Sequence, residues 1–161
     1  MPVPDFITVL RSRIGTDLLW LPGVTGVVLD DAGRVLLGQR SDSGRWALPS
    51  GILEPGEQPA VGLVREIGEE TGVRARVLAL TSVTSGSVVQ YPNGDRSQYL
   101  DLTFWCEATG GEAHVADDES LAVGWFALDA VPADLTASSR ERLTHALAFR
   151  DNPSAGPYFR R

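Results

Sequence analysis

The segment PAVGLVREIGEET, residues 59–71, constrains the fold most, because both of its ends are marked. Pro59 suits the first turn of a helix, where a missing N–H is harmless, and Gly72 suits the residue just past its end. At about 100° per residue, the apolar residues fall on one side of such a helix. These residues are Ala60, Leu63, Val64 and Ile67. The spacing predicts an amphipathic helix over 59–71 with this apolar side buried.

Carboxylates occupy the neighbouring flank of the same helix. Glu66, Glu69 and Glu70 fall within about a third of the circumference, where like charges repel by a few tenths of a kcal/mol per pair. Arg65 precedes Glu69 by four residues and can brace it. Gly62 lies on the acidic side, where a missing side chain leaves room for another group. Hard cations such as Mg²⁺ prefer clustered carboxylate oxygens, so the flank is either a divalent-cation site or an ordinary solvated face.

Strand-like runs surround this central helix. Their patterns predict a hairpin over 23–40, a short strand and loop within 45–57, two runs over 75–91 and 97–108, and a strand over 120–128. Asn93-Gly94 is a strong tight-turn signal between the two long runs. Helical spacing marks two more segments, residues 4–14 and 138–150. Their inward residues are expected to be Phe6, Ile7, Leu10 and Ile14, and Leu143, Ala146, Leu147 and Phe149. This order predicts an α/β sandwich in one domain, residues 1–161.

Composition narrows the class of partner. A formal net charge of −7 argues against capture of DNA, RNA or anionic lipid. No apolar run approaches the roughly 18 residues that a membrane span needs. The first residues lack the basic and apolar regions of a signal peptide, so a cytoplasmic protein is expected. Cys106 is the only cysteine, and its strand-like surroundings predict a small core residue.

Residues 51–73, GILEPGEQPAVGLVREIGEETGV, resemble the Nudix box. The positions that fit the motif are Gly51, Glu57, Arg65, Glu66, Ile67, Glu69, Glu70, Gly72 and Val73. The resemblance implies a Nudix-type α/β/α sandwich with a mixed sheet, a catalytic loop-helix-loop at 51–73 and an N-terminal helical extension at 1–18. It also implies Mg²⁺-dependent hydrolysis of a diphosphate bond, with Mn²⁺ as a substitute, and a homodimer.

The same resemblance implies roles for individual residues. Glu66, Glu69 and Glu70 would bind the metal, together with the carbonyl group of Gly51. Arg65 and Glu57 would be supporting residues, or Arg65 would act in catalysis. The general base would be Glu69 or Glu66. A glutamate outside the box is the alternative, and Glu119 stands six residues before Trp125, where relatives often carry one. Residues 116–120 are otherwise a solvated acidic loop.

The substrate is less clearly marked in the sequence. Base recognition needs an aromatic face and a few polar groups, and Trp46, Tyr91 and Gln98 are candidates. Each aromatic residue could instead belong to the core, and Gln98 to a hairpin. The leading hypothesis is a Mg²⁺-dependent pyrophosphohydrolase of a small nucleotide, either a nucleoside triphosphate or a nucleoside diphosphate linked to another group. The alternatives are a non-catalytic Nudix-like sensor that binds a nucleotide and a plain interaction domain.

Overall fold

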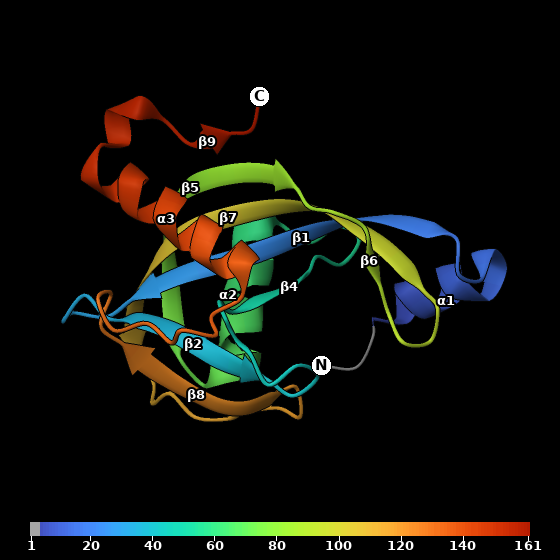
Figure 1. Cartoon of the computed structure of the whole chain (residues 1–161), viewed down its shortest axis with the longest axis horizontal. Coiled ribbons are helices and arrows are strands. Elements are labelled where there is room, and N and C mark those ends of the chain that lie inside the picture. Colours follow the sequence, from blue (N-terminus) through green and yellow to red (C-terminus); the bar gives the residue numbers. More distant parts are fainter. Residues whose placement is uncertain (1–3) are drawn as a thin grey trace.

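The computed structural model describes residues 4–161, which contain three α-helices and nine strands (Figure 1). The helices are α1 (Asp5–Ile14), α2 (Pro59–Thr71) and α3 (Ala137–Asp151), and a short 3-10 helix, η1, spans Pro153–Ala155. The strands are β1 (Leu18–Leu29), β2 (Val35–Arg40), β3 (Trp46–Ala47), β4 (Ser50–Ile52), β5 (Arg74–Ser85), β6 (Val89–Gln90), β7 (Arg96–Gly110), β8 (Ser120–Phe126) and β9 (Tyr158–Phe159).

Within the described residues, all nine strands belong to one mixed sheet. Its main path runs β3-β2-β1-β7-β5-β9, while β4 pairs with β1, β6 with β7 and β8 with β2. Strand β1 is parallel to β7, and β9 is parallel to β5. The pairing of β1 with β4 matters most for function, because it places Val24 opposite Gly51 at the start of the loop that leads into α2.

Alternation along the strands divides the core into two layers. On β1, Val24 and Val28 pack with Leu63 of α2, whereas Val27 and Leu29 pack on the other face with Leu143 of α3. Figure 1 shows the result, with α2 behind the sheet and α3 in front of it. The predicted α/β/α sandwich with a mixed sheet is therefore confirmed.

Helix α2 has the predicted bounds, Pro59–Thr71, and Gly72 ends it in the left-handed conformation with φ 71°. Leu63 and Ile67 are fully buried. Val64 is half-buried and Ala60 is exposed, so the predicted apolar side was too wide. The buried positions of α2 start only at Gly62, because the first turn of the helix projects beyond the hydrophobic core.

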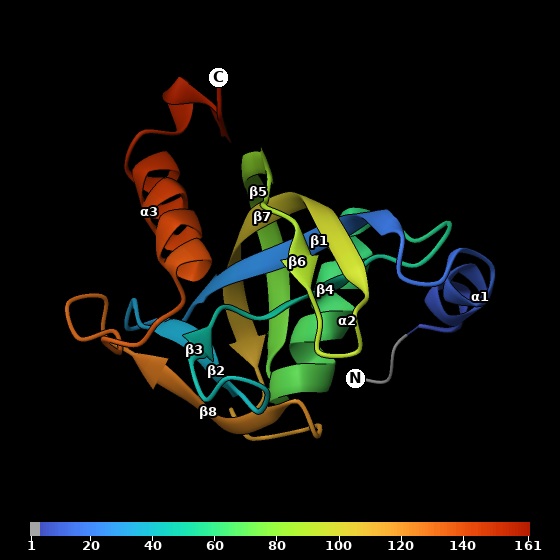
Figure 2. The same ribbon diagram turned by 45° about the vertical axis from the view of Figure 1, so that its right-hand side comes forward.

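Helix α1 packs at the end of the sheet remote from α3 (Figure 2). Ile7 is buried against Leu19 and Leu21 of β1, but Leu10 is exposed, contrary to the prediction, because it lies away from this small cluster. The Arg11 guanidinium fastens α1 by donating to the carbonyl oxygens of Asp17 at 2.6 Å and Arg96 at 2.7 Å. Residues 1–3 of the predicted extension lie outside the described part of the chain.

The C-terminal helix and the turns agree with most of the predicted pattern. In α3, Leu143 and Ala146 are buried, Leu147 packs partly against the core, and Phe149 is half-buried. Gly94 takes φ 90° in the predicted tight turn. Cys106 is fully buried, and burial raises the pKa of its thiol to about 12. No helix within residues 4–161 is long and apolar enough to cross a membrane.

Candidate active site

Arg65 is the centre of the charged side of α2. Its guanidinium donates from Nε to Glu57 Oε1 at 2.9 Å and from a terminal nitrogen to Glu57 Oε2 at 3.0 Å. It also donates to Glu69 at 3.0 Å and lies 3.1 Å from Glu66 Oε1. The side-chain hydrogen bond from Arg65 lowers the pKa of Glu57. Arg65 therefore ties the loop before α2 to the helix and counterbalances three carboxylates.

Glu66 is the most unusual of these carboxylates, because only 1% of it is exposed. Neither side-chain oxygen accepts a hydrogen bond within residues 4–161, and the ion pair with Arg65 is its recorded partner. Burial raises the pKa of Glu66 to about 7, since a charged carboxylate is poorly solvated there. Glu66 is therefore not part of a solvated acidic face.

Gly51 explains how Glu66 can reach its position. A Cβ atom added at Gly51 would lie 2.0 Å from Cδ of Glu66. Only a residue without a side chain allows the carboxylate to press against the β4 backbone at this point. The first residue of the box motif and its first helical carboxylate are therefore in direct contact, although fifteen positions separate them in the sequence (51 to 66).

Glu69 and Glu70 differ from Glu66 and from each other. The Glu69 side chain is 48% exposed, while Glu70 is half-buried and accepts from the backbone N–H of Ser50 at 3.4 Å. Burial raises the pKa of Glu70 to about 8, and the charge of Glu66 adds to this effect. The acidic flank thus changes from a buried to an exposed carboxylate within one turn of helix.

The space left by Gly62 has an occupant from this protein itself. A Cβ atom at Gly62 would lie 2.6 Å from Leu53 Cδ2 and 2.7 Å from Glu57 Oε2. The missing side chain therefore admits the loop that carries Glu57, which Arg65 then fixes. The role of Glu57 as a supporting residue stays a prediction.

The segment between β7 and β8 contacts the C-terminal end of α2. His114 donates its backbone N–H to the carbonyl of Thr71 at 3.0 Å, and Ala116 donates to the carbonyl of Glu70 at 3.4 Å. The charges of Asp117 and Glu119 contribute to the raised pKa of Glu70, so both side chains lie near it. The fold thereby brings Glu119 to the carboxylates of α2.

Arg40 is a basic residue near this cluster that the sequence patterns did not indicate. Its guanidinium donates to Asp42 at 2.9 Å, and the charges of Glu119 and Glu70 help to raise its pKa. The pairing of β2 with β8, with Arg40 opposite Ser120, creates this proximity. The two positions are remote in sequence, so only the sheet register could have revealed it.

The three predicted substrate residues lie in different settings. Trp46 packs edge-on against Phe126, with ring centroids 4.7 Å apart. The Tyr91 hydroxyl forms a 2.7 Å hydrogen bond with the Tyr99 hydroxyl, while the Gln98 amide donates to the Gly86 carbonyl at 2.9 Å. Burial and the hydrogen bond with Tyr99 raise the pKa of Tyr91, and the charges of Arg40 and Asp42 have smaller effects on it. Their roles stay predictions.

The carboxylates of α2 are chemically suited to bind a cation, but they are not arranged as a metal-binding group. Within residues 4–161, no three His, Cys, Asp or Glu side chains form a metal-ligating group. The two buried oxygens of Glu66 that lack hydrogen bonds are nevertheless the kind of orphaned acceptor that a cation satisfies. The Glu69 carboxylate is paired with Arg65 at 3.0 Å.

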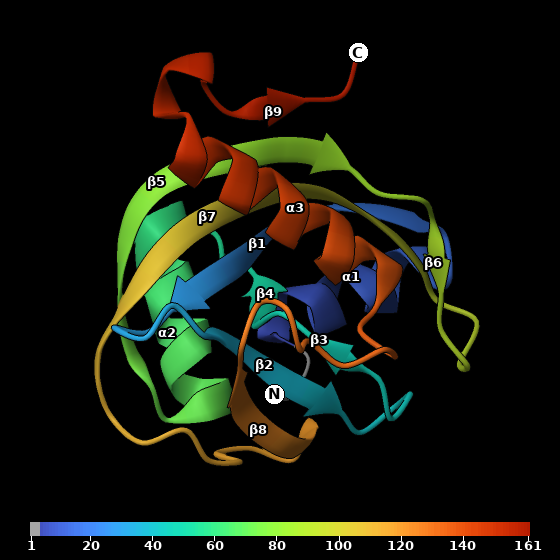
Figure 3. The ribbon, with the colours of Figure 1, turned by 60° about the vertical axis from the view of Figure 1, so that its left-hand side comes forward.

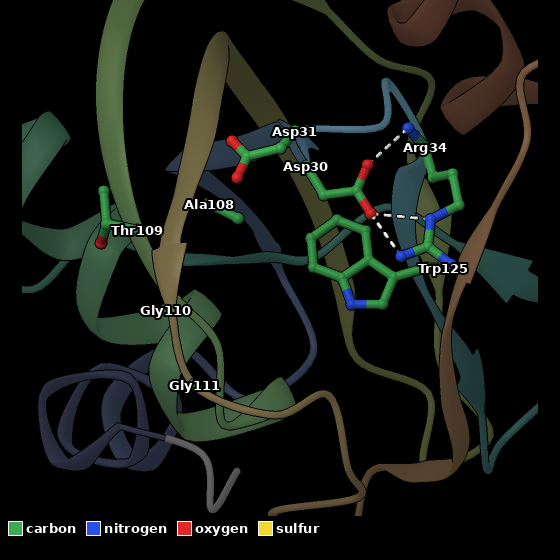
Figure 4. Close-up of a pocket in the computed structure, with 8 residues that line it drawn as sticks. All are labelled: Asp30, Asp31, Arg34, Ala108, Thr109, Gly110, Gly111 and Trp125. Carbon is green, nitrogen blue, oxygen red and sulfur yellow. Dashed lines mark hydrogen bonds and ion pairs between the residues drawn. The ribbon is translucent and has the colours of Figure 1, made fainter.

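A separate hollow of about 360 Å³ lies at the β1–β2 hairpin (Figure 4). The Asp30 carboxylate accepts from Arg34 there at 2.7 Å, and the Trp125 indole lies below them. The hollow lies near the C-terminal end of β1, whereas the carboxylates of α2 lie near its middle, where Val24 pairs with Gly51. None of the carboxylates of α2 lines it, and neither do Arg40 and Glu119.

Comparison with known proteins identifies the family. The NUDIX domain model matches residues 19–147. A MutT-like protein from Streptomyces ambofaciens is 39% identical over 85% of this chain and 80% of its own length. A Bacillus subtilis protein provisionally named an 8-oxo-dGTP diphosphatase is 30% identical over 78% of each chain. The crystal structure of a MutT Nudix hydrolase from Burkholderia pseudomallei covers 79% of this chain and 98% of its own, with 31% identity and a TM-score of 0.59. Together with the box at residues 51–73, these matches show that the chain belongs to the Nudix hydrolase family.

Proposed function

We propose that this Nudix hydrolase is a Mg²⁺-dependent pyrophosphohydrolase of a small nucleotide, with Mn²⁺ able to replace Mg²⁺. Nudix hydrolases generally use divalent metals, and homologues act on small nucleotides. The observation that carries the proposal is the buried carboxylate of Glu66, pressed onto Gly51 with no hydrogen bond to either oxygen. Arg65 shares its single charge among Glu57, Glu66 and Glu69, so a bound cation would add positive charge and satisfy the Glu66 oxygens that accept no hydrogen bond.

Glu66, Glu69 and Glu70 would hold the cation, with the carbonyl oxygen of Gly51 as a further ligand. When bound, the cation would neutralise the linked phosphates and lower the pKa of an attacking water. Arg65 then has a second use, because it keeps Glu69 and Glu57 in place before the cation arrives. The hydrogen bonds between Arg65 and Glu57 support a supporting role for Glu57.

A carboxylate would accept the proton of the attacking water. Glu69 fits this role by its exposure, and Glu66 and Glu119 are the alternatives. Arg40 would contact a phosphate oxygen of the substrate. Its support is its proximity to Glu70 and Glu119. Trp46, Tyr91 and Gln98 remain the proposed contacts to the rest of the nucleotide, with Tyr91 favoured by its neighbours Arg40 and Asp42.

The direct test is a screen of nucleoside triphosphates and nucleoside diphosphate derivatives with Mg²⁺, Mn²⁺ or EDTA, with products identified by mass. Hydrolysis in ¹⁸O-labelled water locates the phosphorus that is attacked. We expect metal-dependent release of a phosphate or pyrophosphate from at least one nucleotide. Tight nucleotide binding without turnover would instead favour the sensor function.

Glu69→Gln and Glu70→Gln test the site directly. Both variants should fold normally and lose nearly all turnover, because each removes a ligand charge without changing side-chain size. Unchanged activity in both would remove these residues from the mechanism. A single domain, a homodimer and a cytoplasmic location remain predictions from the sequence. The net charge of −7 supports a small-molecule partner over a nucleic-acid polymer or a membrane.

A further inference from the structure

Arg40, the last residue of β2, is bound by a carboxylate from the turn that follows it. Its guanidinium donates from Nε to Asp42 Oδ1 at 2.9 Å and from a terminal nitrogen to Oδ2 at 2.5 Å. The side-chain hydrogen bond from Arg40 also lowers the pKa of Asp42, so the pair is ionised at neutral pH. A guanidinium forms the same planar two-point arrangement with a phosphate group. Asp42 therefore occupies donors that Arg40 would offer to a phosphate.

The turn after β2 places the two side chains next to each other without depending on their contact. Arg40 donates its backbone N–H to the carbonyl of Arg45 at 2.9 Å, and Gly44 donates to the carbonyl of Arg40 at 2.8 Å. Gly44 takes φ 68°, a conformation that favours glycine. These backbone bonds close the turn, and the Asp42 side chain takes no part in them.

The same turn is joined to the loop that carries Glu119. Ser41 donates its backbone N–H to the carbonyl of Glu119 at 2.7 Å. The register of β2 with β8 shifts between Gln39 and Arg40, which leaves Leu121 of β8 without a partner on β2. Such bulges re-aim side chains beside functional sites. Figure 3 shows β2 beside β8, with the turn that leaves β2 projecting beyond the end of the strand.

The Arg40–Asp42 pair is of a kind that can be exchanged. The Arg40 side chain is 49% exposed and that of Asp42 is 60% exposed. An ion pair with this much contact to water contributes little to the stability of the fold. Replacing the Asp42 carboxylate by another anion on Arg40 therefore costs the fold little. A phosphate carries more negative charge than a carboxylate and offers the same pair of acceptors.

We infer that Asp42 is an internal competitor of the substrate, which holds Arg40 in the substrate-free enzyme and releases it when a phosphate group binds to the same guanidinium. This inference rests on the proposed function, in which Arg40 contacts a phosphate oxygen. Because the ion pair must break in every binding event, Asp42 lowers the affinity of the site for phosphate-bearing ligands. Removing its charge should tighten their binding, but only while Arg40 is present.

Binding of inorganic pyrophosphate measures this competition without turnover. Pyrophosphate is titrated calorimetrically in Mg²⁺ into the wild-type protein and into Asp42→Asn, Arg40→Gln and the double variant. Asp42→Asn should bind about three- to fivefold more tightly than wild type, the upper part of the range for an exposed ion pair. Arg40→Gln should bind about 10-fold more weakly, because hydrogen bonds from a charged donor are lost.

The double variant distinguishes competition for Arg40 from general repulsion of anions. If Asp42 acts through Arg40, the double variant should bind pyrophosphate within about twofold of Arg40→Gln. An equal tightening by Asp42→Asn in both backgrounds would show that Asp42 only repels anions, and would overturn the inference. No binding of pyrophosphate by Asp42→Asn would overturn it as well.

Asp151→Asn is the matched control for the change in net charge. Asp151 also pairs with an arginine, Arg150, at 3.0 Å, and its side chain is 67% exposed. It lies at the end of α3, away from β2 and β8. This variant should bind pyrophosphate as wild type does, since it removes one negative charge without releasing Arg40.

The outcome is separable from that of the proposed function. With an active enzyme, Asp42→Asn should lower KM for the substrate by the same factor as Kd, because the pair breaks for substrate and transition state alike. Unchanged Kd and KM in this variant would refute the competition and leave the hydrolase assignment intact. Tighter, Arg40-dependent binding by Asp42→Asn in a protein that hydrolyses no nucleotide would keep the competition and refute the hydrolase assignment.

Discussion

Glu66 and Asp101 are buried carboxylates on opposite faces of the same sheet, and their surroundings are opposite in kind. Asp101 has two hydroxyl donors and a guanidinium on its two oxygens. Glu66 has an adjacent guanidinium and no hydrogen bond to either oxygen. Both carboxylate oxygens of Asp101 therefore have partners within this protein. The oxygens of Glu66 accept no hydrogen bond, and burial raises the pKa of Glu66 to about 7.

The difference separates two uses of buried charge. A carboxylate with every acceptor used can orient a neighbour, as Asp101 orients Arg142, but it has little left for a ligand. A carboxylate without hydrogen bonds is costly to the fold, and it persists where a ligand completes it. Removing the charge should therefore have contrary effects at the two positions.

Glu66→Gln should give the largest effect on activity. We expect a loss of about 100- to 10,000-fold in kcat, the range for removing a charged group that acts in the transition state. The Tm of the metal-free protein should stay constant or rise, because a buried charge is lost. Initial rates with Mg²⁺ and thermal melts in EDTA measure both. A Glu66→Gln variant with lower Tm and normal kcat would instead assign Glu66 to the stability of the fold.

Gly51→Ala should come next. The added methyl group would overlap the Glu66 carboxylate, since the Cβ position is 2.0 Å from its Cδ. The side chain must leave its buried place, and kcat should fall by about 10-fold or more, because a displacement of about 1 Å in a reacting group has effects of that size. Gly86→Ala, where a Cβ meets nothing within 4 Å and φ is not positive, controls for the effect of adding a methyl group. Equal kcat values in both variants would show that Gly51 is not needed for that contact.

Asp101→Asn should lower stability instead. The amide cannot balance Arg142 and changes an acceptor into a donor, so the free energy of unfolding should fall by about 1–3 kcal/mol. Urea denaturation of this variant beside Glu66→Gln gives the comparison directly. A loss of kcat larger than the loss in Glu66→Gln would mean that Asp101 acts in the chemistry.

The pH dependence of folding stability should give a smaller effect, which arises from the buried carboxylate of Glu66. The pKa of Glu66 in the folded protein, about 7, lies above its unfolded value of about 4.3. Its contribution to stability is therefore fully present below about pH 4.3 and is lost as pH rises through about 7. Urea melts in EDTA should show a decline between pH 5 and 8, to which Glu66 contributes on the order of 2 kcal/mol.

Millimolar Mg²⁺ should abolish that decline, because a bound cation favours the ionised carboxylate. Glu66→Gln should reduce it even in EDTA, while the contribution of Glu70, whose pKa is raised to about 8, would remain. A wild-type protein with constant stability across this range in EDTA would show that Glu66 does not titrate as its burial indicates.

The sequence by itself determined the local structure around the box. Pro59 and Gly72 fixed the bounds of α2, and the apolar spacing placed Leu63 and Ile67 in the core, because helix ends and periodicity depend on neighbours in sequence. The order of strand-like and helical patterns sufficed for an α/β sandwich, and the resemblance of residues 51–73 to the Nudix box implied the family and its α/β/α class. Ala60 and Leu10 were misplaced because periodicity gives the side of a helix but not how far its contact with the sheet extends.

Only the tertiary structure decided which charges are buried and what surrounds them. On a helical wheel Glu66, Glu69 and Glu70 are equivalent, yet one is buried against Gly51 and another is nearly half exposed. Arg40 joined the site through the pairing of β2 with β8, and Asp101 met Arg142 through the packing of α3 on the sheet. Burial and long-range pairing depend on residues far apart in the chain, so a single local pattern does not contain them.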